Sequence, residues 1–298
     1  MRSTIINKLL EFNKKSNDIM FITADLGFGA FEPVFEAFGN RAINVGIAEQ
    51  NMILFASGLA LNHKKIFCYS IATFPSLRCL EQIRNDTCYH NLDVNILNVG
   101  TGVEYGPLGI THHSTEDVAC LRAIPNMKVY TPSCKEEVAL VMDEIYSCGG
   151  PSYMRMNKSG ATFNSPTNTT INVVENHKSK VAIIASGTIL QEAIDYNSEN
   201  DNKVDIYSLV NYFKNSDMIA NIMKQYDTII SLEEHQLTGG LYSYLCELKN
   251  AFGIETKIIP LAFHNEFTCV VGKQKELRKH YKIDKNEIKK VVEKINKG

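Results

Sequence analysis

The sequence predicts an α/β protein built from two doubly wound α/β domains, and two observations support this prediction. Short apolar runs of strand length alternate with amphipathic segments of helix length, which is typical of mostly parallel sheets covered by helices. Residues 161–179 are rich in Asn, Ser, Thr and Pro and lack periodicity, which indicates a linker. We therefore expect a first domain over 1–160 and a smaller second domain over 180–298.

The first domain begins with a helix over 4–15 and an apolar strand over 19–23. A glycine-rich turn follows, without the spacing of a dinucleotide-binding or P-loop motif. Gly46 allows a tight turn between a strand at 42–45 and an apolar-rich helix at 50–61. The remaining expected elements are strand 65–69, helix 76–88, strand 94–99, a short helix ending at Arg122, strand 128–130, a helix from a Ser133–Glu136 capping box to 147, and strand 152–156.

The second domain repeats the alternation, so the same kind of sheet is expected. The predicted strands are 181–185, 204–208, 228–232 and 257–260, the helices between them are 188–197, 217–225 and 241–251, and two lysine-rich helices end the chain.

Composition excludes several classes of partner. The 31 Lys and Arg against 33 Asp and Glu give a net charge of −2, which argues against nucleic acid or a membrane surface as the main partner. The N-terminal residues lack the apolar core of a signal peptide, and the eight cysteines contain no C-x-x-C pair. We therefore expect a cytoplasmic protein without a zinc site or a disulfide framework.

Glu49 lies where a strand passes into a helix, between Ala48 and other apolar residues. Burial disfavours the charged form of a carboxylate, so its pKa is expected to rise until the group can hold or share a proton near neutral pH. The alternative is a first-turn glutamate that only complements the helix dipole. The local pattern leaves both interpretations open.

A second candidate region is the loop over 100–115, which follows a strand and contains several glycines and the pair His112-His113. Open α/β sheets bind ligands at the carboxyl ends of their strands, so this loop is a candidate ligand-binding segment.

Four segments together resemble the transketolase family of thiamine diphosphate enzymes, in the C-terminal half of its members. They are the runs Gly46-Ile47-Ala48-Glu49-Gln50-Asn51, Gly109-Ile110-Thr111-His112-His113, Leu121-Arg122-Ala123-Ile124-Pro125-Asn126-Met127, and Glu233-Glu234-His235 with Gly239-Gly240-Leu241. The resemblance implies a pyrimidine-binding domain followed by a transketolase C-terminal domain.

The G-D-G…N motif that binds Mg²⁺ and the cofactor's diphosphate in full-length family members is not found in this sequence. The resemblance therefore implies one subunit of a split transketolase, with a separate N-terminal diphosphate-binding subunit that holds Mg²⁺. A heterotetramer is expected, and no metal ligand is assigned to this chain.

The resemblance also implies cofactor-binding residues. Glu49 would share a proton with the ring nitrogen of the aminopyrimidine, and Phe74 would stack on that ring. Ile47 and Ile71 would complete an apolar surround, although the family commonly has an aromatic residue at the second of these positions. Asp25 and Leu26 match a segment that approaches the cofactor from a neighbouring chain, and the alternative for Asp25 is a plain turn residue.

For substrate binding, the resemblance implies that His112 contacts carbonyl or hydroxyl oxygens and acts as a second catalytic residue. His113, Arg2 and Lys158 are further substrate-binding candidates. The outer pocket departs from the family, because Gly29 and Gly100 replace a serine and a histidine that grip phosphate, and Leu108 replaces an acidic residue. We therefore expect a nucleotide-linked or unphosphorylated sugar in preference to the common pentose phosphates.

The expected activity is transfer of a two-carbon ketol unit from a ketose to an aldehyde. A deoxyxylulose-phosphate-synthase-like or 2-oxo acid decarboxylating subunit is the alternative within the enzymes, and a non-catalytic regulatory or binding subunit is the alternative outside them.

Overall fold

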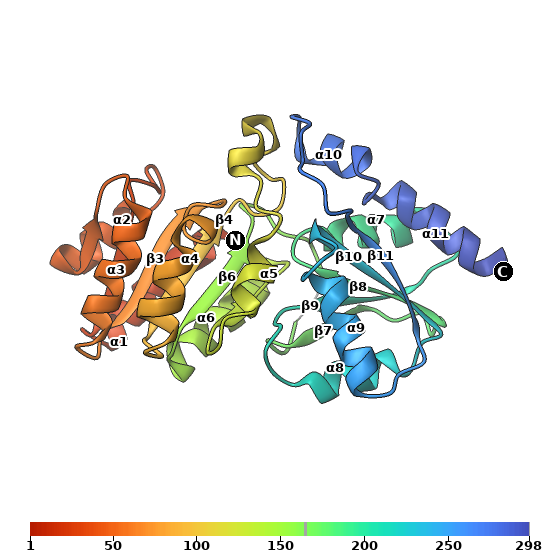
Figure 1. Ribbon diagram of the computed structural model, residues 1–298, viewed down its shortest axis with the longest axis horizontal. Coiled ribbons are helices and arrows are strands. Elements are labelled where there is room, and N and C mark those ends of the chain that lie inside the picture. Colours follow the sequence, from red (N-terminus) through yellow and green to blue (C-terminus); the bar gives the residue numbers. More distant parts are fainter. Residues whose placement is uncertain (164–165, 298) are drawn as a thin grey trace.

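The computed structural model describes residues 1–163 and 166–297, which form two sheets side by side, each covered by helices (Figure 1). The first sheet has six parallel strands in the order β2-β1-β3-β4-β6-β5, and the expected doubly wound arrangement is confirmed. Its strands are β1 (Ile19–Thr23), β2 (Ala42–Asn44), β3 (Lys65–Ile71), β4 (Val94–Val99), β5 (Lys128–Tyr130) and β6 (Ser152–Met156).

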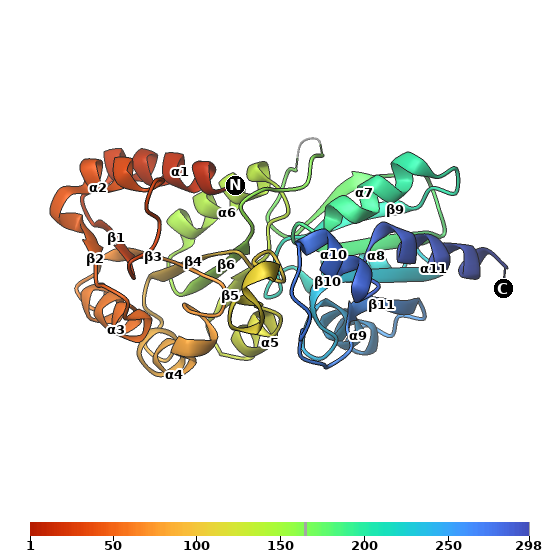
Figure 2. The ribbon, with the colours of Figure 1, turned by 90° about the horizontal axis from the view of Figure 1, so that it is seen from above.

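Helices cover both faces of this sheet, as Figure 2 shows from above. On one face lie α1 (Arg2–Lys15), α2 (Glu32–Phe38) and α6 (Lys135–Cys148), and on the other lie α3 (Glu49–Ala60), α4 (Leu80–Gln82) and α5 (Asp117–Arg122). Every residue of β1, β4 and β6 is buried, because each of these strands is covered on both sides.

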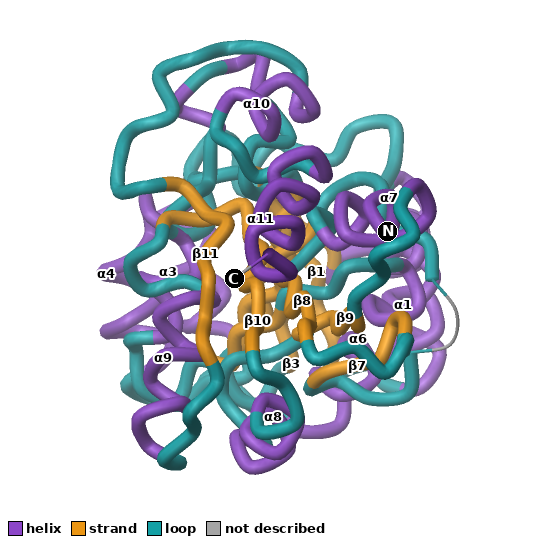
Figure 3. The backbone as a smooth tube through the Cα atoms, turned by 90° about the vertical axis from the view of Figure 1, so that its right-hand side faces the viewer, coloured by secondary structure: helices purple, strands orange, loops and turns teal. Residues whose placement is uncertain are grey.

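The second sheet has five strands in the order β11-β10-β8-β9-β7, and Figure 3 shows it between its helices. Residues of α7 and α11 pack into one core with it, and α8 and α9 belong to the core on its other face. The elements are β7 (Ile171–Glu175), β8 (Val181–Ser186), α7 (Leu190–Glu199), β9 (Asp205–Leu209), α8 (Ser216–Met223), β10 (Thr228–Gln236), α9 (Leu241–Ala251), β11 (Lys257–Phe263), α10 (Gln274–His280) and α11 (Lys285–Lys297).

Three local expectations need correction. The expected linker over 161–179 contains β7, which pairs antiparallel with β9, and residues 164–165 of that linker lie outside the described residues. The expected helix over 76–88 is instead a 3₁₀ turn, a short α-helix and a π-helical turn. The helix α6 begins one residue later than expected, because Cys134 accepts the amide of Glu137 while the Glu137 carboxylate accepts the amide of Ser133.

The register of the first sheet brings the ends of its strands to one edge. Thr23 pairs with both Asn44 and Tyr69, and Val99 pairs with both Ile71 and Met156. Since the strands are parallel, the loops that leave their carboxyl ends all start at this edge. These loops carry the residues that the sequence singles out.

A buried polar network joins the two halves. Asn98 donates a hydrogen bond to the hydroxyl of Tyr153 (2.6 Å), and that hydroxyl donates to Asp117 (2.5 Å). Arg155 donates from Nε to Asp117 (3.0 Å) and from Nη2 to the carbonyl of Glu234 in the second half (2.8 Å). All four hydrogen bonds are out of contact with water, so they fix the first sheet against the end of β10.

In the ranges 1–163 and 166–297, no helix is both long and apolar enough to cross a membrane.

Candidate active site

Glu49 is the first residue of α3, and the turn before it determines its position. The chain leaves β2, turns at Gly46 with φ of +78°, and starts α3 after Ala48. The side chain of Glu49 is only 3% exposed, whereas the preceding Ile47 is 80% exposed. The strand-to-helix turn therefore directs the carboxylate into the protein and leaves its apolar neighbour on the surface.

The guanidinium group of Arg78 binds this carboxylate. Its Nη1 donates to Glu49 Oε2 at 2.6 Å, and its central carbon lies 4.3 Å from the centre of the Phe74 ring. The side chain of Gln50 donates to the backbone carbonyl of Arg78 (3.1 Å), which fixes the turn that carries it. The expectation that Glu49 lies among apolar side chains is incomplete, because a cation completes its surroundings.

Nothing in the sequence singled out Arg78. The ion pair joins residues 29 positions apart, and the turn between them is irregular. The sequence offers one weak signal for Arg78, which is a basic residue four positions after Phe74, at the start of the predicted helix.

His112 lies at the rim of the same site. Its ring packs edge-on against Phe74, with centroids 5.1 Å apart, and Tyr105 lies beyond it at 6.1 Å. Partial burial lowers the pKa of His112, and the nearby His113 and Arg78 lower it further. The imidazole is therefore neutral at pH 7, with one ring nitrogen as donor and the other as acceptor.

His113, a predicted substrate-binding residue, is only 1% exposed. Its Nδ1 lies 2.6 Å from the hydroxyl of Thr268 in the second half, and its Nε2 lies 3.2 Å from the carbonyl of Gly106. Both ring nitrogens are thus engaged within the protein, and substrate binding by His113 stays a prediction. These contacts tie the loop of His112 to the second half.

Tyr105 organises the outer part of the site, and the sequence interpretation did not include it. The ammonium of Lys158 lies 4.3 Å from the centre of the Tyr105 ring. The charge of Arg2 acts on the Tyr105 phenol, although burial dominates and raises the pKa of this phenol to about 12. A side chain at Gly100 would collide with the same ring, so this position of Tyr105 requires a glycine there. Arg2 and Lys158 therefore both lie by Tyr105.

Glu104 lies beside this group. Its carboxylate accepts the backbone amide of Lys158 at 2.8 Å, and burial raises its pKa to about 7.

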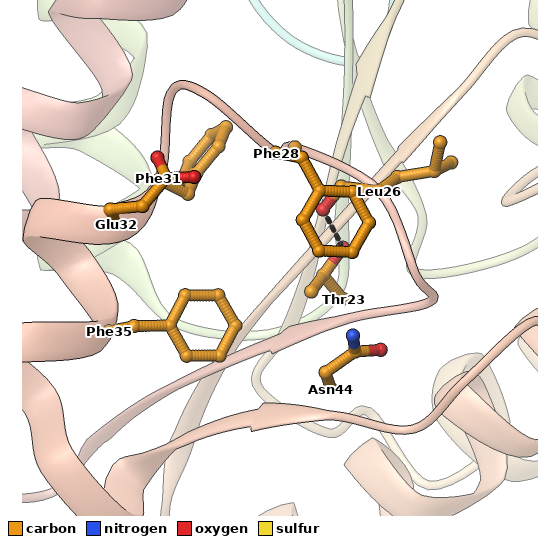
Figure 4. A pocket seen from close by; sticks show the side chains of 8 residues that line it. Thr23, Leu26, Phe28, Phe31, Glu32, Phe35 and Asn44 are labelled. Atoms are coloured by element: carbon orange, nitrogen blue, oxygen red, sulfur yellow. Dashed lines mark hydrogen bonds between the residues drawn. The ribbon is translucent and has the colours of Figure 1, made fainter.

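Asp25 and Leu26 form a separate group around Asn44, at the ends of β1 and β2. Asp25 has φ of +54°, and its amide donates to the side chain of Asn44, which also accepts the amide of Gly46. Asn44 thus holds together the two turns that follow these strands. Leu26 lines a pocket of about 280 Å³, together with Phe28 and other aromatic residues (Figure 4).

Ile71 ends β3 directly before Ala72, which has φ of +52°. A left-handed alanine is a strained conformation, and it turns the chain sharply toward Phe74. In the described ranges, no group of three or more His, Cys, Asp or Glu side chains could hold a metal ion.

Comparisons with known proteins agree with the motifs and the fold. The family model of the transketolase pyrimidine-binding domain matches residues 1–162. The sequence is 28% identical to one of the subunits of apulose-4-phosphate transketolase from Actinobacillus succinogenes, over 97% of this chain and 96% of the relative. It is 31% identical to a protein named as a transketolase C-terminal section in Methanocaldococcus jannaschii, over 100% of this chain and 96% of that protein.

The fold is also that of a solved protein described as a split gene transketolase, inactive beta4 tetramer. The TM-score is 0.85, with 24% sequence identity over 98% of this chain and 97% of the solved one. The match of the family model to more than half of the chain, and the full-length similarity to a transketolase subunit and to a transketolase C-terminal section, confirm the resemblance seen in the motifs. The chain belongs to the transketolase family.

Proposed function

We propose that this chain is the pyrimidine-binding subunit of a thiamine diphosphate-dependent transketolase. It transfers a two-carbon ketol unit from a ketose to an aldehyde, together with a second subunit that holds Mg²⁺ and the diphosphate. The observation that supports this most strongly is that a buried carboxylate, Glu49, and the ring of Phe74 lie on either side of one planar group, the Arg78 guanidinium.

These two residues fit an aminopyrimidine. A flat, cationic group already lies between them, since the Arg78 guanidinium both hydrogen-bonds Glu49 and stacks on Phe74. An aminopyrimidine is equally flat and also presents a ring nitrogen that can share a proton with a carboxyl group. The local geometry therefore accepts a planar nitrogen heterocycle.

The cofactor, when bound, supplies the carbon nucleophile that attacks the substrate carbonyl. In this proposal Glu49 holds a proton at the pyrimidine ring nitrogen, and Phe74 orients the ring. The neutral imidazole of His112 lies 5.1 Å from Phe74, measured between ring centres, and would hydrogen-bond the oxygens of the substrate. Ile47 and Ile71 would line the apolar surround, and Asp25 and Leu26 would reach a cofactor shared with a neighbouring chain.

Exposed apolar side chains beside the site support a requirement for another subunit. Ile47 is 80% exposed, Phe28 71%, Leu54 45% and Phe55 39%. A group of large apolar side chains of this kind is usually covered by a partner. The two relatives, one named as a transketolase subunit and the other as a C-terminal section, have nearly the length of this chain, which also supports a two-subunit enzyme.

The solved split gene transketolase is described as an inactive beta4 tetramer, which supports self-association in the absence of a second subunit. We place the assembly in the cytoplasm, as part of the same proposal, since eight free cysteines suit a reducing compartment.

For the substrate, we propose a ketose other than the common pentose phosphates. Gly29 offers no side chain, the ring of Tyr105 covers Gly100, and Lys158 lies on Tyr105 as a flexible point charge. Planar arginine forks bind phosphate better than such an arrangement. One relative is named for apulose 4-phosphate, a phosphorylated sugar outside the common pentose phosphates, so its name supports a specialised donor but gives no support for an unphosphorylated one.

The test is ketol transfer by the purified chain, measured alone and after reconstitution with the second subunit. We expect no turnover and weak binding of thiamine diphosphate by the chain alone, and turnover after reconstitution, because the diphosphate carries most of the charge of the cofactor. A panel of ketoses with and without phosphate, and a 2-oxo acid donor, separates ketol transfer from decarboxylation. Full turnover by the lone chain, or turnover of the 2-oxo acid alone, would contradict the proposal.

A further inference from the structure

We propose that Arg78 occupies the position of the cofactor's aminopyrimidine until the cofactor binds, and that its displacement controls cofactor affinity and binding rate. This inference rests on the proposed function and adds to it a residue of this chain that competes with the cofactor.

Two contacts define the position of the guanidinium group. One is the hydrogen bond of 2.6 Å from its Nη1 to Glu49, and the other is the distance of 4.3 Å from its central carbon to the centre of the Phe74 ring. A pyrimidine that stacks on this face of Phe74 and hydrogen-bonds the Glu49 carboxyl group meets the same two conditions. It must therefore fill the same volume, and both groups cannot be there at once.

Arg78 resembles the ring chemically as well. A guanidinium group is planar, stacks on aromatic faces and presents N–H donors in its plane. An isolated buried carboxylate is unfavourable, so Glu49 should pass directly from one partner to the other, with a proton taken up from solvent and shared between its carboxyl group and the ring nitrogen. Arg78 keeps Glu49 hydrogen-bonded before the cofactor arrives, and the ring nitrogen replaces it afterwards.

The surroundings of Arg78 allow this movement. Its side chain is 46% exposed, whereas the side chains of Arg155 and Arg278, which also pair with buried acids, are 5% and 7% exposed. Arg155 and Arg278 each bind more than one acceptor inside the protein. The amide of Arg78 donates to the carbonyl of Thr73 and its own carbonyl accepts from Gln50, so the side chain can swing into solvent while the backbone stays.

The experiment uses the variants Arg78→Ala and Arg78→Lys, with Arg84→Ala as the matched control. Arg84 is an exposed arginine of the same segment, and its guanidinium group donates to the neighbouring Asn85. Binding of thiamine diphosphate with Mg²⁺ is measured by calorimetry and stopped-flow mixing on the reconstituted assembly. Unfolding temperatures of the variants show that each one folds.

Arg78→Ala is expected to bind the cofactor roughly threefold to tenfold more tightly, with faster association, because no ion pair has to break. Arg78→Lys keeps the charge but not the planar stacking, so it should lie between Arg78→Ala and the wild type. Arg84→Ala should match the wild type.

A second measurement does not depend on activity. The full chain, labelled with ¹⁵N at arginine, is titrated with 4-amino-2-methylpyrimidine, and the Nε–H signal of Arg78 is followed by NMR. The signal should move to the position of a solvent-exposed arginine as the probe binds.

The outcomes separate the two proposals. The role of Arg78 would be overturned if the cofactor binds while the Arg78 signal stays unchanged and Arg78→Ala binds the cofactor no more tightly than the wild type does. The proposed function would still stand in that case. If neither the wild type nor Arg78→Ala binds the cofactor in the assembly, both proposals fail.

Discussion

Glu49 and Glu233 are both buried glutamates beside a helix N-terminus, one in each half of the molecule, yet their surroundings differ. Glu233 lies near the end of β10, where its carboxylate accepts the amides of Leu241 (2.6 Å) and Tyr242 (2.9 Å) at the start of α9. Glu49 opens α3 and binds the half-exposed side chain of Arg78. One carboxylate is held by fixed backbone, and the other is held by a partner that can leave.

This difference shows what a ligand site requires beyond a buried acid. Burial raises the pKa of Glu233 to about 7, but both of its oxygens are committed to α9. A carboxylate can serve a ligand only if its hydrogen-bond partner is replaceable. Glu49 has such a replaceable partner in Arg78, whereas Glu233 does not.

The largest expected effect is on turnover, in the variant Glu49→Gln. Glutamine keeps the size of the side chain and can still accept a hydrogen bond from Arg78, but it cannot share a proton with the cofactor. Turnover of the reconstituted enzyme should fall by about 10²–10⁴-fold, with little change in the unfolding temperature. If activity stays within a few-fold of the wild type while the cofactor is bound, Glu49 does not share a proton with the cofactor, and it then differs from Glu233 in its contacts but not in its chemistry.

The variant Glu233→Gln should instead change stability and its pH dependence. The folded pKa of Glu233 is about 7 against an ordinary value of 4.5, so the folded state holds its proton more tightly than the unfolded state. The stability that this proton contributes is fully present below pH 4.5 and is lost as the pH rises through 7.

Relative to Glu233→Gln, the wild type should lose up to about 3 kcal/mol of unfolding free energy across that interval. Urea unfolding of both proteins at several pH values measures this difference. Glu104 and Glu137, whose pKa values burial also raises to about 7, are present in both proteins and cancel. A difference that does not vary with pH would show that Glu233 titrates normally.

The smallest effect is expected at the contact between the halves, in Thr268→Val. This change keeps the shape of the side chain but removes the hydroxyl that lies 2.6 Å from His113. Losing one buried hydrogen bond should cost about 1–2 kcal/mol. The loop of His112 should loosen, lowering kcat by a few-fold, whereas Thr268→Ser should restore both values. An unchanged kcat in Thr268→Val, despite lower stability, would limit His113 to a structural role.

Much of this architecture could be predicted from local patterns. Alternating apolar and amphipathic segments gave the strands and helices of both sheets, and the motifs led to Glu49, Phe74 and His112, which lie at one edge of the first sheet. The fourth motif contains His235, whose Nε2 accepts the amide of Ala119 across the halves.

The parts that were missed depend on contacts between distant residues. The ion pair of Arg78 spans 29 positions, and the bond between His113 and Thr268 spans 155. Tyr105 matters because its ring folds back over Gly100, which no periodicity reveals. The strand β7 is short and follows a stretch of polar residues, so the sequence pattern predicts linker there, and pairing with β9 stabilises the strand.

The buried network through Asp117 and Arg155 also limits how the enzyme can move. Closing or opening one half against the other would break the buried hydrogen bond from Arg155 to the carbonyl of Glu234, at a cost of about 1.5–3 kcal/mol. The two halves should therefore diffuse and scatter as one rigid body, with the same small-angle X-ray profile before and after ligand binding. Movements that admit cofactor and substrate are then confined to side chains and loops at the sheet edge and to the separation of whole subunits.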